Sequence, residues 1–130
     1  MSSRRSRSAS FRAVLAAADV VLDTFHWSGG NTSLDAFAAG TPVVTLPGRF
    51  MRGRQTAAML AMMGLDALVA ASPGDYVPLA MRIARDRDAN RELRSRIAAA
   101  REALFERREP VAALQESLLA AAAGHGVPVL

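Results

Sequence analysis

Neither cysteine nor lysine occurs in the sequence, and aromatic residues make up only 5% of it. The absence of cysteine excludes disulfides, thiolate metal sites and cysteine nucleophiles. Because lysine is absent, all 16 basic residues are arginines, which keep their charge at any working pH. They outnumber the 12 acidic residues and give a formal net charge of +4. Arginines and acids alternate at helical spacing within 82–88, and no nucleic-acid-binding motif accompanies the charge. We therefore expect paired charges on helix surfaces and no nucleic-acid partner.

Long apolar runs are also absent. No stretch reaches the ~18 uninterrupted apolar residues that a membrane span needs. The chain begins with an arginine- and serine-rich segment, and the apolar run after it is interrupted by Asp19 and Asp23, unlike a signal peptide. We therefore expect a cytoplasmic protein that does not contact a membrane.

The size of the chain limits it to one domain or part of one. Its 130 residues are 51% apolar, which is enough for a single core. A complete enzyme of two lobes needs about 250 residues, because each lobe must bury its own core. We divide the chain into a disordered basic N-terminus (1–10), a partial ligand-binding lobe (11–123) and a flexible tail (124–130).

Short β-branched runs alternate with helical patterns in the first half of the chain. The alternation predicts helices over 11–18, 33–39 and 53–63, strands over 20–22 and 42–46, and a third strand over 65–70. Such an order is typical of an α/β fold in which crossover helices join parallel strands. From Pro73 onward, alanine, arginine, glutamate and leucine predict three helices, over 75–85, 90–105 and 110–122. A complete Rossmann-type sheet has about six strands. We therefore expect only part of such a sheet here, with its other half upstream of Met1.

Ligands of parallel sheets bind beyond the carboxyl ends of the strands. The loop after the first strand brings two glycines to the start of the next helix, where unpaired amides and the helix dipole suit a diphosphate. The candidate diphosphate-binding residues are Gly29, Gly30, Asn31, Thr32 and Ser33. Asp35, one turn into the helix, is a candidate acceptor for ribose hydroxyls. The alternative is that Asn31 or Thr32 only caps the helix and that Asp35 only complements its dipole.

The same edge of the sheet carries further candidate pocket residues. His26 and Trp27 lie in the first loop, although a histidine without a carboxylate or metal partner can equally serve as a structural hydrogen-bonding group. Arg52 and Arg54 lie in the loop after the second strand, where they could neutralise phosphate or belong to a solvated basic loop. The glycine spacing matches neither Gly-x-Gly-x-x-Gly nor a Walker loop, so the sequence carries no dinucleotide or ATP motif.

Three segments follow one another in order along the chain. They are Ala-Asp-Val-Val-Leu-Asp-Thr (18–24), Gly-Gly-Asn-Thr-Ser-Leu-Asp (29–35) and Ala-Gly-Thr-Pro-Val-Val-Thr-Leu-Pro-Gly (39–48). Together they resemble the O-GlcNAc transferase and SPINDLY family of glycosyltransferases. The resemblance implies the C-terminal, partial Rossmann-like lobe of a GT-B glycosyltransferase, a fold that the family usually carries behind TPR repeats. It also implies that Gly30, Asn31 and Thr32 bind the diphosphate of a UDP-sugar and that Asp35 holds the ribose. Animal members carry His-Thr-Thr where this chain has Gly30-Asn31-Thr32, which leaves the sugar and the nucleotide open.

The predicted function is therefore the UDP-sugar-binding portion of a protein O-GlcNAc-transferase-like glycosyltransferase. The resemblance implies a donor such as UDP-GlcNAc, inverting transfer to a protein hydroxyl, and no metal or other cofactor. We expect an isolated fragment to be inactive and to need upstream TPR or catalytic segments as partners. No catalytic base is identified, since Asp23 and Asp35 are the only carboxylates near the site and Asp35 is assigned to the ribose. The alternative function is a non-catalytic interaction module with apolar helix faces.

Overall fold

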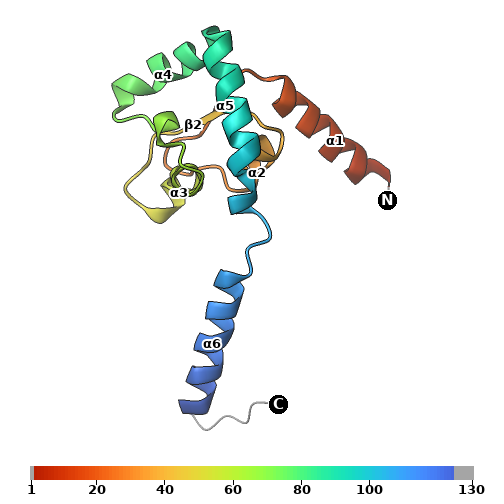
Figure 1. Ribbon diagram of the computed structural model, residues 1–130, viewed down its shortest axis with the longest axis vertical. Coiled ribbons are helices and arrows are strands. Elements are labelled where there is room, and N and C mark those ends of the chain that lie inside the picture. The colour runs from red at the N-terminus through yellow and green to blue at the C-terminus, as the bar shows by residue number, and fades with distance from the viewer. Residues whose placement is uncertain (1, 125–130) are drawn as a thin grey trace.

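The structure is a computed structural model that describes the backbone of residues 2–124 and the side chains of residues 9–124 (Figure 1). Most of the predicted tail, residues 125–130, lies outside this range. The helices are α1 (Ser2–Ala17), α2 (Asn31–Ala38), α3 (Gln55–Met62), α4 (Pro73–Arg85), α5 (Arg87–Ala100) and α6 (Glu109–Gly124). The strands are β1 (Val21–Leu22) and β2 (Val43–Val44), and short 3-10 helices are η1 (Met51–Gly53), η2 (Asp66–Leu68) and η3 (Arg101–Leu104). Within residues 2–124, no helix is long and apolar enough to cross a membrane.

The sheet is parallel and small. β1 pairs with β2 in the register Val21↔Val43 and Leu22↔Val44, and α2 forms the crossover between them. The predicted third strand over 65–70 is wrong as an extended strand, because η2 occupies its middle. Val69 alone pairs with the sheet, through a parallel bridge to Thr45. The predicted parallel order is thus present, with strands shorter than expected.

The core lies between the sheet and helices α2, α3, α4 and α5. Phe37, Leu60, Leu68 and Ile97 are fully buried and come from α2, α3, η2 and α5. Each such side chain contributes roughly 1.5–3 kcal/mol when it is removed from water. Helix α5 runs along one side of this body and contributes the first part of the helix predicted over 90–105; η3 contributes the rest (Figure 1).

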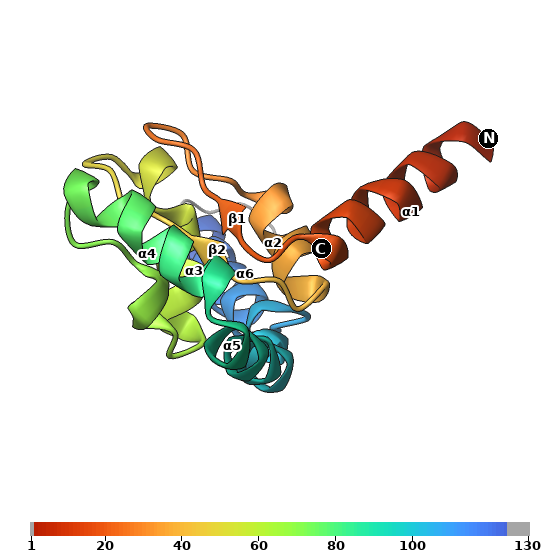
Figure 2. The same ribbon diagram turned by 90° about the horizontal axis from the view of Figure 1, so that it is seen from above.

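Helix α1 projects from the body, and its C-terminal end is held against it (Figure 2). Leu15 is buried, and its carbonyl accepts a 2.7 Å hydrogen bond from the Thr41 hydroxyl. The helix starts well before the predicted range of 11–18 and includes most of the segment predicted to be disordered. The physical reason is that residues 2–10 contain no glycine or proline, and extending an anchored helix costs less than nucleating one.

Helix α6 extends away from the body on the connection after η3, toward the bottom of Figure 1. It agrees with the helix predicted over 110–122, but none of its side chains is buried. Its apolar residues Val111, Leu114, Leu118 and Leu119 are all exposed.

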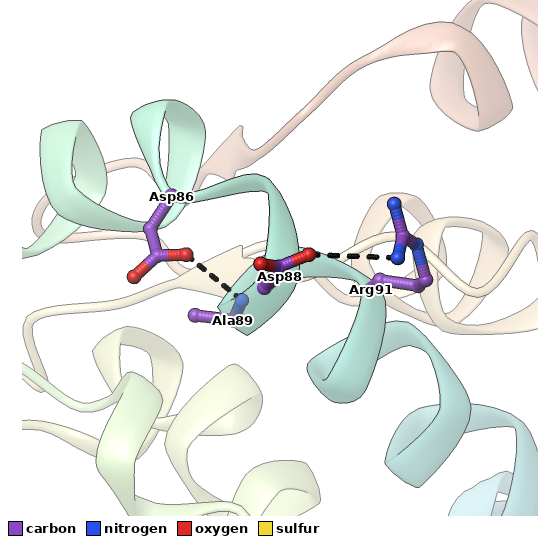
Figure 3. Close-up of polar contacts among 4 residues, drawn as sticks. All are labelled: Asp86, Asp88, Ala89 and Arg91. Carbon is purple, nitrogen blue, oxygen red and sulfur yellow. Dashed lines mark hydrogen bonds and ion pairs between the residues drawn. The ribbon is translucent and has the colours of Figure 1, made fainter.

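The arginines of α5 and η3 make two kinds of contact, only one of which is with acids. At its start, Asp86 accepts a 3.0 Å hydrogen bond from the Ala89 amide, and the exposed pair Asp88–Arg91 spans 3.5 Å (Figure 3). Further along the chain, arginines of α5 and η3 instead donate to carbonyls at the ends of other helices. Arg94 donates to Ala18 after α1, Arg96 to Gly64 after α3, and Arg101 to Ala38 of α2. Cations at helix C-termini are favoured by the helix dipole, so these arginines hold three helix ends together.

We predict that Arg94→Met destabilises the protein by about 1–3 kcal/mol, because it removes the donor to Ala18 and a 2.9 Å bond to Asn90. Arg91→Met is the matched control, because Arg91 lies one turn earlier on the same helix and makes only an exposed ion pair with Asp88. It should cost less than about 1 kcal/mol. Urea unfolding followed by circular dichroism measures both. Equal losses for the two variants would contradict this role for Arg94.

Candidate functional site

The loops that follow β1 and β2 meet at the carboxyl edge of the sheet, as the parallel topology predicts (Figure 2). The amide of Ser28 in the first loop donates a 2.8 Å hydrogen bond to the carbonyl of Arg52 in the second. The second loop is closed by a 2.8 Å bond from the Gly48 amide to the Gly53 carbonyl. The start of α2 follows directly on the first of these loops.

Asp23, the residue after β1, is the centre of the hydrogen bonds at this edge. Its side chain is buried and accepts four bonds. Oδ1 accepts from the amides of Thr24 (3.1 Å) and Gly29 (2.6 Å). Oδ2 accepts from the hydroxyls of Ser28 and Thr45, both at 2.7 Å. The carboxylate therefore joins its own loop to the end of β2.

Three buried hydroxyls extend these bonds to α2 and α3. Thr56 Oγ1, in the first turn of α3, lies 2.8 Å from Ser28 Oγ and 2.7 Å from Ser33 Oγ of α2. The Thr56 amide also donates to Ser28 Oγ at 3.0 Å. We call Asp23, Ser28, Ser33, Thr45 and Thr56 together the Asp23 network. It connects the carboxyl ends of both strands with the starts of two helices.

Tyr76 of α4 supports the network from the core side. Its hydroxyl donates a 2.6 Å hydrogen bond to the Asp23 carbonyl, and its ring packs against Phe25 with centroids 4.9 Å apart. Burial raises the pKa of Tyr76, and the negative charge of Asp23 raises it further. The phenol therefore stays protonated and remains a donor. Sequence reasoning missed this residue, and its only signal was that it is the single tyrosine of the chain.

The start of α2 leaves its first amides available. Gly30 is the N-cap residue, and no side chain caps the helix. Among the described residues, none accepts a hydrogen bond from the backbone amides of residues 30–33, which we call the α2 amides. The side chains of Asn31 and Thr32 are exposed, so the alternative in which one of them caps the helix is wrong. Asp35, one turn further on, is half-buried.

The structure gives Gly29 and Ser33 protein partners. The Gly29 amide donates to Asp23, and the Ser33 hydroxyl is bonded to Thr56. A Cβ atom at Gly29 would lie 2.8 Å from Ser33 Oγ and 3.3 Å from Asp23 Oδ1, which explains the glycine there by packing. Diphosphate binding stays a prediction for all five candidates, but this amide and this hydroxyl hold the loop in place.

The remaining candidates lie on the two adjoining loops. His26 is exposed and adopts a left-handed backbone conformation with φ 66°. Trp27 is 68% exposed. Arg52 stacks over Phe50, with 4.9 Å from its guanidinium carbon to the ring centroid. Arg54 is turned back onto its own loop, since its Nη1 donates to the Gly48 carbonyl at 2.9 Å. Their role as a ligand pocket stays a prediction.

Comparison with known proteins identifies the family. The model of Glycosyl transferase family 41 matches residues 11–114. A probable UDP-N-acetylglucosamine–peptide N-acetylglucosaminyltransferase SPINDLY of Oryza sativa subsp. japonica is 38% identical over 76 residues, which are 58% of this chain and 8% of that protein. The UDP-N-acetylglucosamine–peptide N-acetylglucosaminyltransferase of Caenorhabditis elegans is 36% identical over 78 residues, or 60% of this chain and 7% of that protein.

A solved structure extends the match in three dimensions. A mutant of the Thermobaculum terrenum O-GlcNAc transferase superposes with a TM-score of 0.73 at 33% sequence identity. The superposition covers 85% of this chain and 21% of that one. The predicted fold class, a partial α/β lobe of a GT-B glycosyltransferase followed by helices, is therefore confirmed. The matched region is a small part of each relative's length. Because the family model matches most of this chain, the chain belongs to Glycosyl transferase family 41.

Proposed function

We propose that this chain provides the donor-binding part of a glycosyltransferase that moves a sugar from a UDP-sugar to a protein hydroxyl. The observation that carries the proposal is the set of α2 amides, which lie at the carboxyl edge of the sheet without protein acceptors among the described residues. Such amides, together with the positive end of a helix dipole, bind phosphate groups in many α/β proteins. The names of the relatives, which refer to UDP-N-acetylglucosamine and peptide, support the choice of donor and acceptor.

The proposed chemistry is inverting transfer. The acceptor oxygen bonds to the anomeric carbon while the bond from that carbon to the diphosphate oxygen breaks, and the hydroxyl proton passes to a base outside the residues assigned here. Negative charge grows on the departing diphosphate. Amides fixed in place before the reaction stabilise that charge without reorganising, which is the largest contribution that a protein usually makes. The α2 amides and the Arg52 guanidinium serve this purpose, and no metal ion takes part.

Side chains around the α2 amides fit further parts of the donor. Asn31 and Thr32 are exposed beside the amides and can add donors to the phosphates. The half-buried carboxylate of Asp35 can accept from ribose hydroxyls. Arg52 carries a positive charge on the loop after β2, and Trp27 offers an exposed aromatic face on the loop after β1.

One observation favours the second candidate function, a non-catalytic interaction module. Helix α6 exposes Val111, Leu114 and Leu118 at spacings of three and four residues, which places them along one face. Binding of UDP separates the two functions, because an interaction module of this kind has no reason to bind a nucleotide.

We predict that the full chain binds UDP and that Asn31→Ala and Asp35→Ala each raise its Kd about five- to tenfold, or roughly 1–1.4 kcal/mol. Each variant removes one polar partner of the donor. Gln115→Ala and Glu116→Ala on α6 remove an amide and a carboxylate far from the site, and they should leave the Kd unchanged. Isothermal titration calorimetry measures all five proteins. Absence of UDP binding by the unaltered chain would refute the proposed function.

We also predict that the phosphates supply much of the affinity. UDP should bind at least about tenfold more tightly than uridine, because charge-assisted hydrogen bonds to phosphate are the stronger class. At about 1 M salt, where the Debye length falls to about 3 Å, this difference should shrink. The same calorimeter compares both ligands at low and high salt. Equal affinities for UDP and uridine at low salt would place the ligand away from the α2 amides.

A further inference from the structure

We propose that Asp23 is a positioning residue, which sets the location of the α2 amides without touching the donor. The inference deepens the proposed function and rests on it for the identity of the ligand. Asp23 is 7% exposed and has its four acceptor bonds to protein groups, so it is not available to a ligand at the surface. Its carboxylate acts on the site only through the backbone that it holds.

The first link runs along the chain. The bond from the Gly29 amide to Asp23 Oδ1 is 2.6 Å long, and the bond from the Ser28 hydroxyl to Oδ2 is 2.7 Å. These two residues directly precede Gly30, the N-cap of α2. Two short bonds to a carboxylate therefore fix the backbone immediately before the α2 amides begin, so that Gly30 has little freedom to rotate its peptide groups away from the edge of the sheet.

The second link runs through space. Ser33 of α2 is bonded to Thr56 of α3, which contacts Ser28 and so returns to Asp23. Thr45 at the end of β2 donates to the same carboxylate oxygen as Ser28. The first turn of α2 is thus held by the Ser33 side chain as well as by the preceding loop. The position of the α2 amides relative to β2 and α3 depends on this one acceptor.

Two effects of Asp23 on a bound diphosphate have opposite signs. Its negative charge lies close behind an anion site, so removal of the charge alone would strengthen binding of UDP. Its hydrogen bonds hold the amides in place, so removal of the bonds would weaken binding. Asp23→Asn removes the charge and keeps the size of the side chain. Its NH2 group takes the place of one carboxylate oxygen and cannot accept the hydrogen bonds that this oxygen accepts. The direction of the change in Kd therefore distinguishes the two effects.

The first test needs no ligand. Amide hydrogen exchange measured by NMR should be at least about tenfold faster at Gly29 in Asp23→Asn than in the unaltered chain, because the variant weakens the bond that protects this amide. The amide resonances of Gly30, Asn31 and Thr32 should shift. The Ile97 amide in α5 should keep its protection, which shows that the body is still folded. Unchanged exchange at Gly29 together with unchanged resonances at the α2 amides would overturn the inference.

The second test is titration with UDP. Asp23→Asn and Thr45→Val should each raise the Kd about tenfold, which corresponds to ~1.4 kcal/mol, with an unchanged number of sites per chain. A loss of folded protein would instead lower the number of sites and leave the Kd as it was. Thr45→Ser keeps the hydroxyl and should restore the affinity, and Ser117→Ala on α6 is the control for removal of a hydroxyl elsewhere.

The outcomes separate the inference from the proposed function. If the unaltered chain does not bind UDP, the proposed function fails, and hydrogen exchange at Gly29 still decides whether Asp23 positions the α2 amides. If the unaltered chain binds UDP but Asp23→Asn binds it equally or more tightly, the positioning role fails while the proposed function stands. If Asp23→Asn does not fold, amide hydrogen exchange and titration with UDP are measured on Thr45→Val and Thr45→Ser instead.

Discussion

A single buried carboxylate determines how the carboxyl edge of this sheet is built. Strands of two residues supply few ladder hydrogen bonds, so they cannot by themselves align the loops that follow them. Asp23 replaces that missing alignment, since its two oxygens accept from the loop after β1 and from Thr45 at the end of β2. A buried charge is costly unless it is fully hydrogen-bonded. The four donors meet that requirement, and in doing so they bring separate segments to one point.

The same arrangement explains why the start of α2 has no side-chain cap. The serine and threonine hydroxyls nearby, Ser28, Ser33 and Thr56, are directed into the Asp23 network rather than toward the helix amides. Those amides are consequently left without protein acceptors among the described residues. An uncapped helix start costs stability of about 1 kcal/mol. Here that cost coincides with the place where parallel sheets bind ligands, so the feature fits a site better than it fits a purely structural helix.

The part of this fold that could be predicted from sequence is the part set by local patterns. Apolar β-branched runs predicted both strands, and the glycines with a following polar stretch predicted a helix start at the sheet's edge. The Asp23 network could not be predicted, because its hydroxyls come from positions as far apart as Ser28 and Thr56 and look like ordinary loop and helix residues. The third strand failed for a local reason: in the turn of η2, the amides of Leu68 and Val69 bond to the carbonyls three residues earlier. Only the Leu68 carbonyl and the Ala70 amide, on either side of Val69, are left to bond with Thr45. The contacts of Arg94 and Arg101 could not be predicted either, because helical spacing shows nearby acids but not the distant carbonyls that these side chains reach.

The two glycines of the loop differ in what the structure requires of them. At Gly29, a Cβ atom would press against Ser33 Oγ and Asp23 Oδ1, both of which are fixed in the network. At Gly30, it would meet only Gln55 Oε1, at 2.9 Å, the end of a flexible side chain that can swing away. A side chain at that position is compatible with an intact Asp23 network, whereas one at Gly29 is not. Position 30 can therefore carry a side chain while the buried carboxylate keeps the α2 amides in the same place.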